Sequence, residues 1–100
     1  MLRITVEENP KTIVMKLEGR IAGPWAVELG RLWEQTAPAL ANRKLSLDLR
    51  GTTYADACGI RELKNIYSQT EAEILARTPW TQYLADEVKR KDAEPKDKEA

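Results

Sequence analysis

The stretch LDLRGTTYADACGI at residues 47–60 contains the pattern from which the fold of this chain can be worked out. It begins in a short alternating strand over residues 45–49, crosses a predicted loop at 51–55, and reaches Asp56. Aspartate is favoured directly before a helix because its carboxylate accepts hydrogen bonds from the free amides of the first turn. Ile60, Leu63 and Ile66 then follow at helical spacing. The stretch therefore predicts a strand, a loop and a helix that begins beside Asp56.

Upstream of this stretch, the sequence predicts an antiparallel hairpin and a helix. Apolar and polar residues alternate over 2–8 and again over 12–18, with the turn signal Asn9-Pro10 between them. Pro24 suits the first position of a helix, and apolar residues follow at helical spacing. Pro38 lies inside that pattern and should end or kink the helix near Ala37.

Downstream, residues 73–76 are a weak candidate for a fourth strand, and a last helix should follow the capping residue Thr78. Its Trp80, Tyr83, Leu84 and Val88 are expected to face the core. Residues 91–100 are mostly charged and should form a disordered tail. We therefore expect one α/β domain over residues 1–90, with a mixed four-stranded sheet and helices packed on it.

Composition excludes several classes of function. The 100 residues carry 16 basic and 16 acidic side chains, so bulk positive charge cannot hold nucleic acid. Histidine is absent and there is one cysteine, which excludes histidine-dependent catalysis, an internal disulfide and a cysteine-rich zinc site. No apolar run is long enough to span a membrane. We expect a cytoplasmic protein without cofactor, metal, nucleic-acid partner or direct membrane insertion.

Residues Leu47-Asp48-Leu49 and Asp56-Ala57-Cys58-Gly59-Ile60, together with the upstream Leu17–Ile21 segment, resemble a STAS domain, the fold of the anti-sigma factor antagonists. The resemblance covers roughly residues 2–90 and is most specific at the Asp-x-x-Gly helix start. Between Gly59 and Pro79 the chain is shorter than is usual for the family. The resemblance implies a STAS-like mixed sheet, shortened relative to the family.

The resemblance also implies a regulatory protein–protein interaction module and not an enzyme. In typical antagonists, a serine follows the aspartate and is phosphorylated by a partner serine kinase that is also an anti-sigma factor. Here Ala57 occupies the serine position, so the usual phospho-switch should be absent. The expected partner is an anti-sigma factor, a serine kinase-like protein or another signalling protein of bacterial transcription regulation.

The expected partner-binding residues surround the start of the helix that follows Asp56. They are Asp56, Ala57, Cys58, Gly59, Arg61, Lys64 and, from the preceding helix, Trp25. All of them except Ala57 have a purely structural alternative: Asp56 as a plain cap, Cys58 and Gly59 as packing positions, Trp25 as core, and the basic residues as a solvated face. A homodimer is also compatible with the pattern, because the first hairpin could leave an exposed edge.

Two other functions stay open at this point. A small cytosolic STAS subunit of a transport or larger signalling complex would need no phosphorylated serine, and Ala57 suits that role. Cys58 lies in a first helical turn, where a thiol can be activated, so a redox sensor or an enzyme centred on it is the third hypothesis. No second cysteine is available to resolve an oxidised form.

Overall fold

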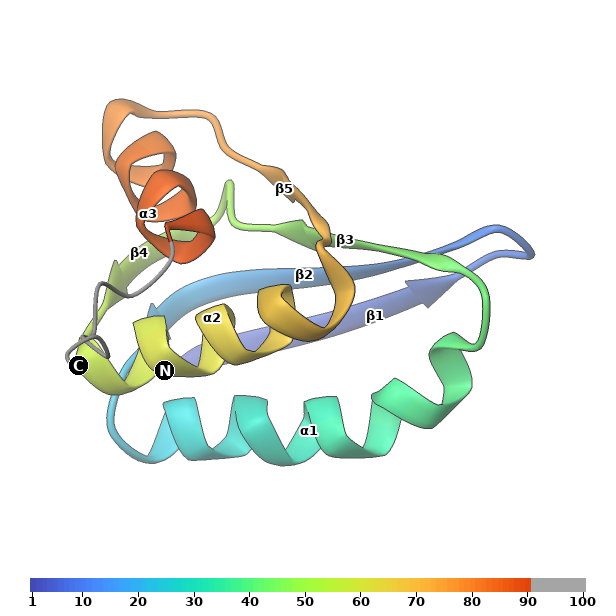
Figure 1. The fold of residues 1–100 in the computed structure, drawn as a ribbon. Helices are drawn as coiled ribbons and strands as arrows, with labels where there is room; N and C mark the ends of the chain where they lie inside the picture. Colours follow the sequence, from blue (N-terminus) through green and yellow to red (C-terminus); the bar gives the residue numbers. More distant parts are fainter. Residues whose placement is uncertain (91–100) are drawn as a thin grey trace, which may run out of the picture.

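The first two strands form the predicted hairpin (Figure 1). In the computed structural model, which describes residues 1–90, β1 (Leu2–Glu8) pairs antiparallel with β2 (Thr12–Ile21). The register sets Ile4 opposite Leu17 and Val6 opposite Met15. Residues directly opposite each other share a face, so the apolar side chains of both strands point to one side of the sheet. The tail predicted at residues 91–100 lies outside the described residues.

Two further strands extend the sheet in parallel orientation. β3 (Lys44–Asp48) pairs with β2, and β5 (Glu73–Leu75) pairs with β3, which gives the order β1-β2-β3-β5. β3 is therefore internal, and its Leu45 and Leu47 are buried. This mixed α/β architecture confirms the predicted fold class.

A fifth strand corrects the predicted loop at residues 51–55 and the predicted number of strands. β4 (Thr52–Ala55) pairs in parallel with the end of β2, at Gly19–Ile21. β2 is long, and β3 pairs only with its Thr12–Lys16 half, so the remaining half is open to another strand. The run Thr52-Thr53-Tyr54 consists of residue types that favour strands. The sheet therefore continues up to the residue before Asp56.

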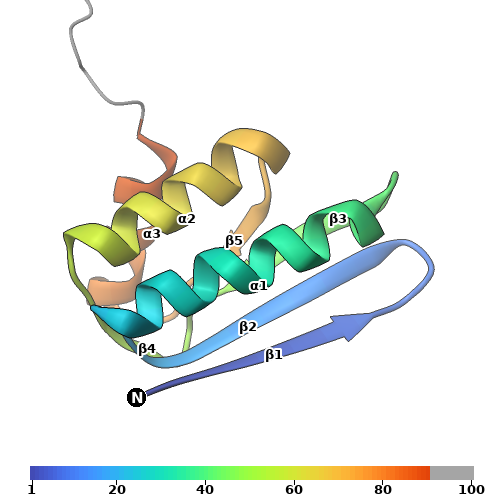
Figure 2. The ribbon, with the colours of Figure 1, turned by 90° about the horizontal axis from the view of Figure 1, so that it is seen from below.

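Helices α1 (Pro24–Leu40) and α2 (Ala57–Thr70) lie side by side on one face of the sheet, as Figures 1 and 2 show. Between them and the strands lies the hydrophobic core, which includes Leu29, Trp33, Leu63 and Ile66 together with buried residues of β2 and β3. Of the two effects predicted for Pro38, an end or a kink of the helix near Ala37, the first does not occur, because α1 continues to Leu40. Its last part rises out of line with the rest in Figure 1, which fits a bend caused by proline.

Helix α3 (Pro79–Lys89) packs against α2 and β4 and begins as predicted. The Thr78 hydroxyl accepts from the amide of Thr81 at 3.1 Å, while the Thr81 hydroxyl accepts from the amide of Thr78 at 2.8 Å. The prediction that Trp80 and Tyr83 face the core is wrong, since both are exposed. Leu84 and Val88 are buried as predicted, and Thr81 and Ala85 complete the buried face, because α3 touches its neighbours along a narrow stripe.

Candidate functional site

Asp56 joins the starts of two helices. Its carboxylate accepts a hydrogen bond from the amide of Gly59 in α2 at 2.8 Å and another from the amide of Gly23 at 3.0 Å. Gly23 is the residue before α1 and has a φ of 56°, in the left-handed region that glycine adopts without strain. Asp56 therefore does more than cap its own helix: it ties the first turn of α2 to the loop that leads into α1.

These two amides also set the ionisation of Asp56. The hydrogen bond from Gly59, followed by the one from Gly23, lowers the pKa of the carboxyl below its usual value, because both donors favour the charged form. Asp56 is therefore a carboxylate at neutral pH. An ionised group at this place also suits the positive end of the α2 dipole.

Gly59 is a packing residue between α2 and β2. It is buried, and a Cβ built on it would lie 2.1 Å from the carbonyl oxygen of Ile21 at the end of β2. That oxygen also accepts the amide of Asp56 at 3.2 Å. The first turn of α2 thus rests directly on the backbone of β2, and the close-packing alternative holds for Gly59. Gly59 therefore allows the first turn of α2 to lie this close to β2.

Three of the predicted residues form an exposed patch around Asp56. Ala57 and Cys58 are exposed in the first turn of α2, and Trp25, in the first turn of α1, has 39% of its surface exposed. Trp33, by contrast, is buried in the core and donates its indole N–H to Gln69. The same residue type is therefore core in the middle of α1 and surface at its start.

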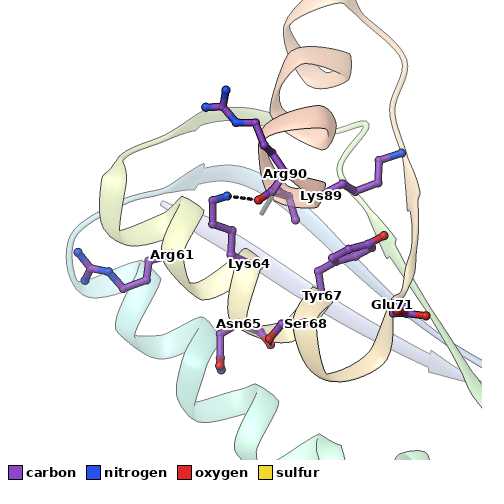
Figure 3. Close-up of a pocket in the computed structure, with 9 residues that line it drawn as sticks. Arg61, Lys64, Asn65, Tyr67, Ser68, Glu71, Lys89 and Arg90 are labelled. Atoms are coloured by element: carbon purple, nitrogen blue, oxygen red, sulfur yellow. Dashed lines mark hydrogen bonds between the residues drawn. The ribbon is translucent and has the colours of Figure 1, made fainter. Parts of the chain in front are cut away.

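Arg61 and Lys64 continue this patch along α2 toward α3. Lys64 donates a hydrogen bond to the backbone carbonyl of Arg90 at 2.7 Å, which joins α2 to the end of α3, while Arg61 points away from that contact (Figure 3). A hollow of about 580 Å³ lies between the two helices. It is lined by the basic residues Arg61, Lys64, Lys89 and Arg90, the acidic Glu71, and Asn65, Tyr67, Ser68 and Val88.

The basic hollow was missed by sequence reasoning. Lys89 and Arg90 stand more than twenty residues beyond Arg61, and only the packing of α3 on α2 brings them together. Arg50, in the turn between β3 and β4, is engaged elsewhere: its Nε and Nη2 each donate to the Asp48 carboxylate at 3.0 Å. This bidentate pair lowers the pKa of Asp48, whose side chain is almost fully buried.

The described part of the chain holds no group of three cysteine, aspartate or glutamate side chains that could bind a metal ion. In residues 1–90, no helix is long and apolar enough to cross a membrane.

Cys58, the centre of the redox hypothesis, is a free, exposed cysteine on the patch. The arrangement at the start of α2 thus consists of a fixed backbone and exposed side chains.

No protein-family model and no curated protein sequence matches this chain. Solved structures do. The anti-sigma factor antagonist SpoIIAA in its unphosphorylated form matches with a TM-score of 0.60 at 10% identity, over 84% of this chain and 82% of that one. An anti-sigma factor antagonist from Mycobacterium paratuberculosis matches with a TM-score of 0.59 at 20% identity, over 83% and 74%.

A third structure, Mglu, matches with a TM-score of 0.59 at 18% identity. The match covers 75% of this chain but 19% of that one, so this chain spans about a fifth of the length of Mglu. At these identities the likenesses establish the fold, and the chain has the STAS-like fold that the residues around Asp56 predict.

Proposed function

We propose that this chain is a non-enzymatic regulatory module that docks a protein partner through the starts of α1 and α2. The docking surface consists of Trp25, Asp56, Ala57, Cys58, Arg61 and Lys64. The observation that carries the proposal is the double hydrogen bond from Gly23 and Gly59 to Asp56. A helix cap needs only the hydrogen bond from Gly59. The additional bond from Gly23 joins the starts of the two helices into one rigid surface.

The side chains of this surface suit protein recognition. Trp25 offers a partly exposed aromatic ring, a residue type that often anchors interfaces, and small residues beside it let a partner approach the backbone of α2. The basic hollow, which is lined by Arg61, Lys64, Lys89 and Arg90, adds positive charge on the side of the surface that faces α3. A partner with an apolar pocket next to an acidic patch would match both features.

The partner proposed is a soluble anti-sigma factor, a serine kinase-like protein or another signalling protein. Its class rests on the resemblance around Asp56 and on the STAS-like fold. Ala57 offers no hydroxyl at the position where the antagonists carry their phosphorylated serine. Docking would then be constitutive, with its extent set by the amount of partner.

Affinity capture from the source cell's lysate, read by mass spectrometry, tests this proposal. The wild-type chain is compared with Arg61→Glu/Lys64→Glu and with the control Lys11→Glu/Lys44→Glu. The control reverses the charge of two exposed lysines near the hairpin turn. This turn lies at the end of the sheet away from the start of α2 (Figure 1). We expect the wild type and the control to retain one signalling protein that the first variant loses.

Two outcomes contradict the proposal. If all three baits retain the same partner, the docking surface lies elsewhere. If they retain membrane transport components in fixed ratio, the chain is a subunit of such an assembly, which is the second hypothesis. Circular dichroism of each bait establishes beforehand that the substitutions leave the fold unchanged.

A further inference from the structure

We infer that two copies of this chain associate through β1, which pairs antiparallel with β1 of the second copy about a two-fold axis at Thr5. This goes beyond the proposed function, because it concerns the edge of the sheet and a second copy of the chain. The dimer would contain one continuous sheet that crosses both molecules.

The edge at β1 is open for pairing. β1 ends the strand order and pairs with β2 alone in the described structure, and Figure 2 shows it clear of α1 at the margin of the molecule. It contains no proline, and the register shift of the sheet falls between Gly19 and Arg20 of β2, not in β1. β1 therefore has neither a proline nor a bulge, two of the features by which edge strands avoid pairing with another chain.

The backbone of β1 offers its hydrogen bonds at alternate residues. The amide of Arg20 donates to the carbonyl of Met1, and the amide of Asn9 donates to the carbonyl of Thr12. In an antiparallel ladder the bonded pairs alternate with non-bonded ones, so Arg3, Thr5 and Glu7 turn their amides and carbonyls toward β2. The amides and carbonyls of Leu2, Ile4, Val6 and Glu8 consequently point away from β2, toward the free edge.

The charges of β1 are arranged symmetrically. Arg3 and Glu7 lie two residues before and two residues after Thr5. A two-fold axis at Thr5 therefore sets each Arg3 opposite Glu7 of the second copy, at non-bonded pairs where side chains approach most closely. Both residues are exposed, and neither forms an ion pair within residues 1–90. The strand is thus complementary to its own copy, as a two-fold interface requires.

The opposite face of β1 fits the same register. Leu2, Ile4 and Val6 pack against the core yet remain half-buried, because nothing covers their outer side in the described structure. With the axis at Thr5, Ile4 lies beside Val6 of the second copy in a hydrogen-bonded pair. The apolar row would continue across the two-fold axis at Ile4 and Val6, which would lose their remaining contact with water, while each Leu2 would lie at the end of the row, opposite Glu8 of the second copy.

Sedimentation velocity over a range of protein concentrations tests this dimer. The variants are Arg3→Glu, Glu7→Arg and the double exchange Arg3→Glu/Glu7→Arg, with Lys11→Glu as a control that changes the net charge by the same amount as Arg3→Glu. Each single variant sets like charges opposite each other at two places. Each single variant loses two attractive cross-strand pairs and gains two repulsive ones, so we expect its dissociation constant to rise roughly 30-fold.

The double exchange separates this register from any other explanation. It places opposite charges across the two-fold axis again, with their signs reversed at both positions. The double variant should therefore dimerise about as tightly as the wild type, and so should Lys11→Glu. A wild type that stays monomeric at about millimolar concentration overturns the inference. A dimer that the single variants do not weaken, or that the double exchange does not restore, overturns it equally.

Discussion

Replacement of Gly59 by alanine is expected to destabilise the protein strongly for a substitution that adds one methyl group. The new Cβ would lie 2.1 Å from the carbonyl oxygen of Ile21 and 2.9 Å from its Cγ2. Contacts under 3.0 Å are essentially never seen for real Cβ atoms, and the oxygen belongs to a strand that cannot turn aside. The first turn of α2 must therefore move away from β2.

The magnitude follows from two opposing effects. Overpacking a tight contact costs about 3 kcal/mol where backbone has to shift, the upper part of the usual range. Alanine is favoured over glycine inside a helix by about 1 kcal/mol, which offsets part of that cost. The free energy of unfolding should fall by about 2 kcal/mol, and the Tm of a domain of this size by roughly 10 °C.

Gly30→Ala is the matched control, since Gly30 also lies inside a helix. A Cβ there would meet the Glu62 Oε1 at 2.6 Å, but that atom is the far end of a flexible side chain and can move aside. We expect this variant to equal the wild type or to exceed it by up to about 1 kcal/mol. Urea and thermal unfolding followed by far-UV circular dichroism measure both. If Gly59→Ala is as stable as Gly30→Ala, the close contact between α2 and β2 does not exist.

Three further predictions concern the proposed docking surface. Because the amides of Gly59 and Gly23 lower the pKa of Asp56 below its unfolded value of about 3.9, its stabilisation is complete above that pH and is lost as pH falls through the lowered pKa. Asp56→Asn should therefore be less stable than the wild type in urea unfolding at pH 7, and the difference should narrow below about pH 4; a constant difference would show that ionisation is irrelevant. Ala57→Glu should keep the stability of the wild type, since an acidic residue in a first helical turn is favourable by about 0.3–1 kcal/mol, but should lose the partner in affinity capture. Alkylation of the exposed Cys58 with a bulky maleimide should leave the circular dichroism spectrum unchanged but reduce the amount of partner recovered in affinity capture. An undiminished recovery would show that Cys58 is not part of the proposed docking surface.

Local features of the fold were predictable from the sequence, because short-range chemistry determines them. The alternation over residues 2–8 specifies a strand wherever it is placed, and Asp56 caps the helix that follows it through an amide only three residues away. Gly59 could likewise be assigned to packing, since glycine inside a helix needs a reason to be there. For the strand and the cap, sequence neighbours are also neighbours in space, whereas Ile21, the residue that Gly59 packs against, is distant in the sequence and is identified by the structure alone.

The remainder depends on contacts between distant segments. The hydrogen bond from Gly23 to Asp56 spans 33 positions, and no local pattern announces it. β4 exists because β2 is longer than β3, a comparison that requires the register of the sheet. The helical spacing of Trp80 predicts a core residue, but spacing alone does not fix which stripe of α3 meets α2, and Trp80 is exposed. The basic hollow was missed for the same reason.

Hydrogen–deuterium exchange of the chain, alone and bound to the partner recovered by affinity capture, tests the docking surface most directly. If the starts of α1 and α2 form that surface, binding should slow exchange in the backbone amides of residues 22–27 and 56–64. The amides near the hairpin turn, at residues 8–12, should exchange at the same rate in both states. Slowed exchange confined to the hairpin, with residues 22–27 and 56–64 unchanged, would contradict docking at the surface that Asp56 holds together.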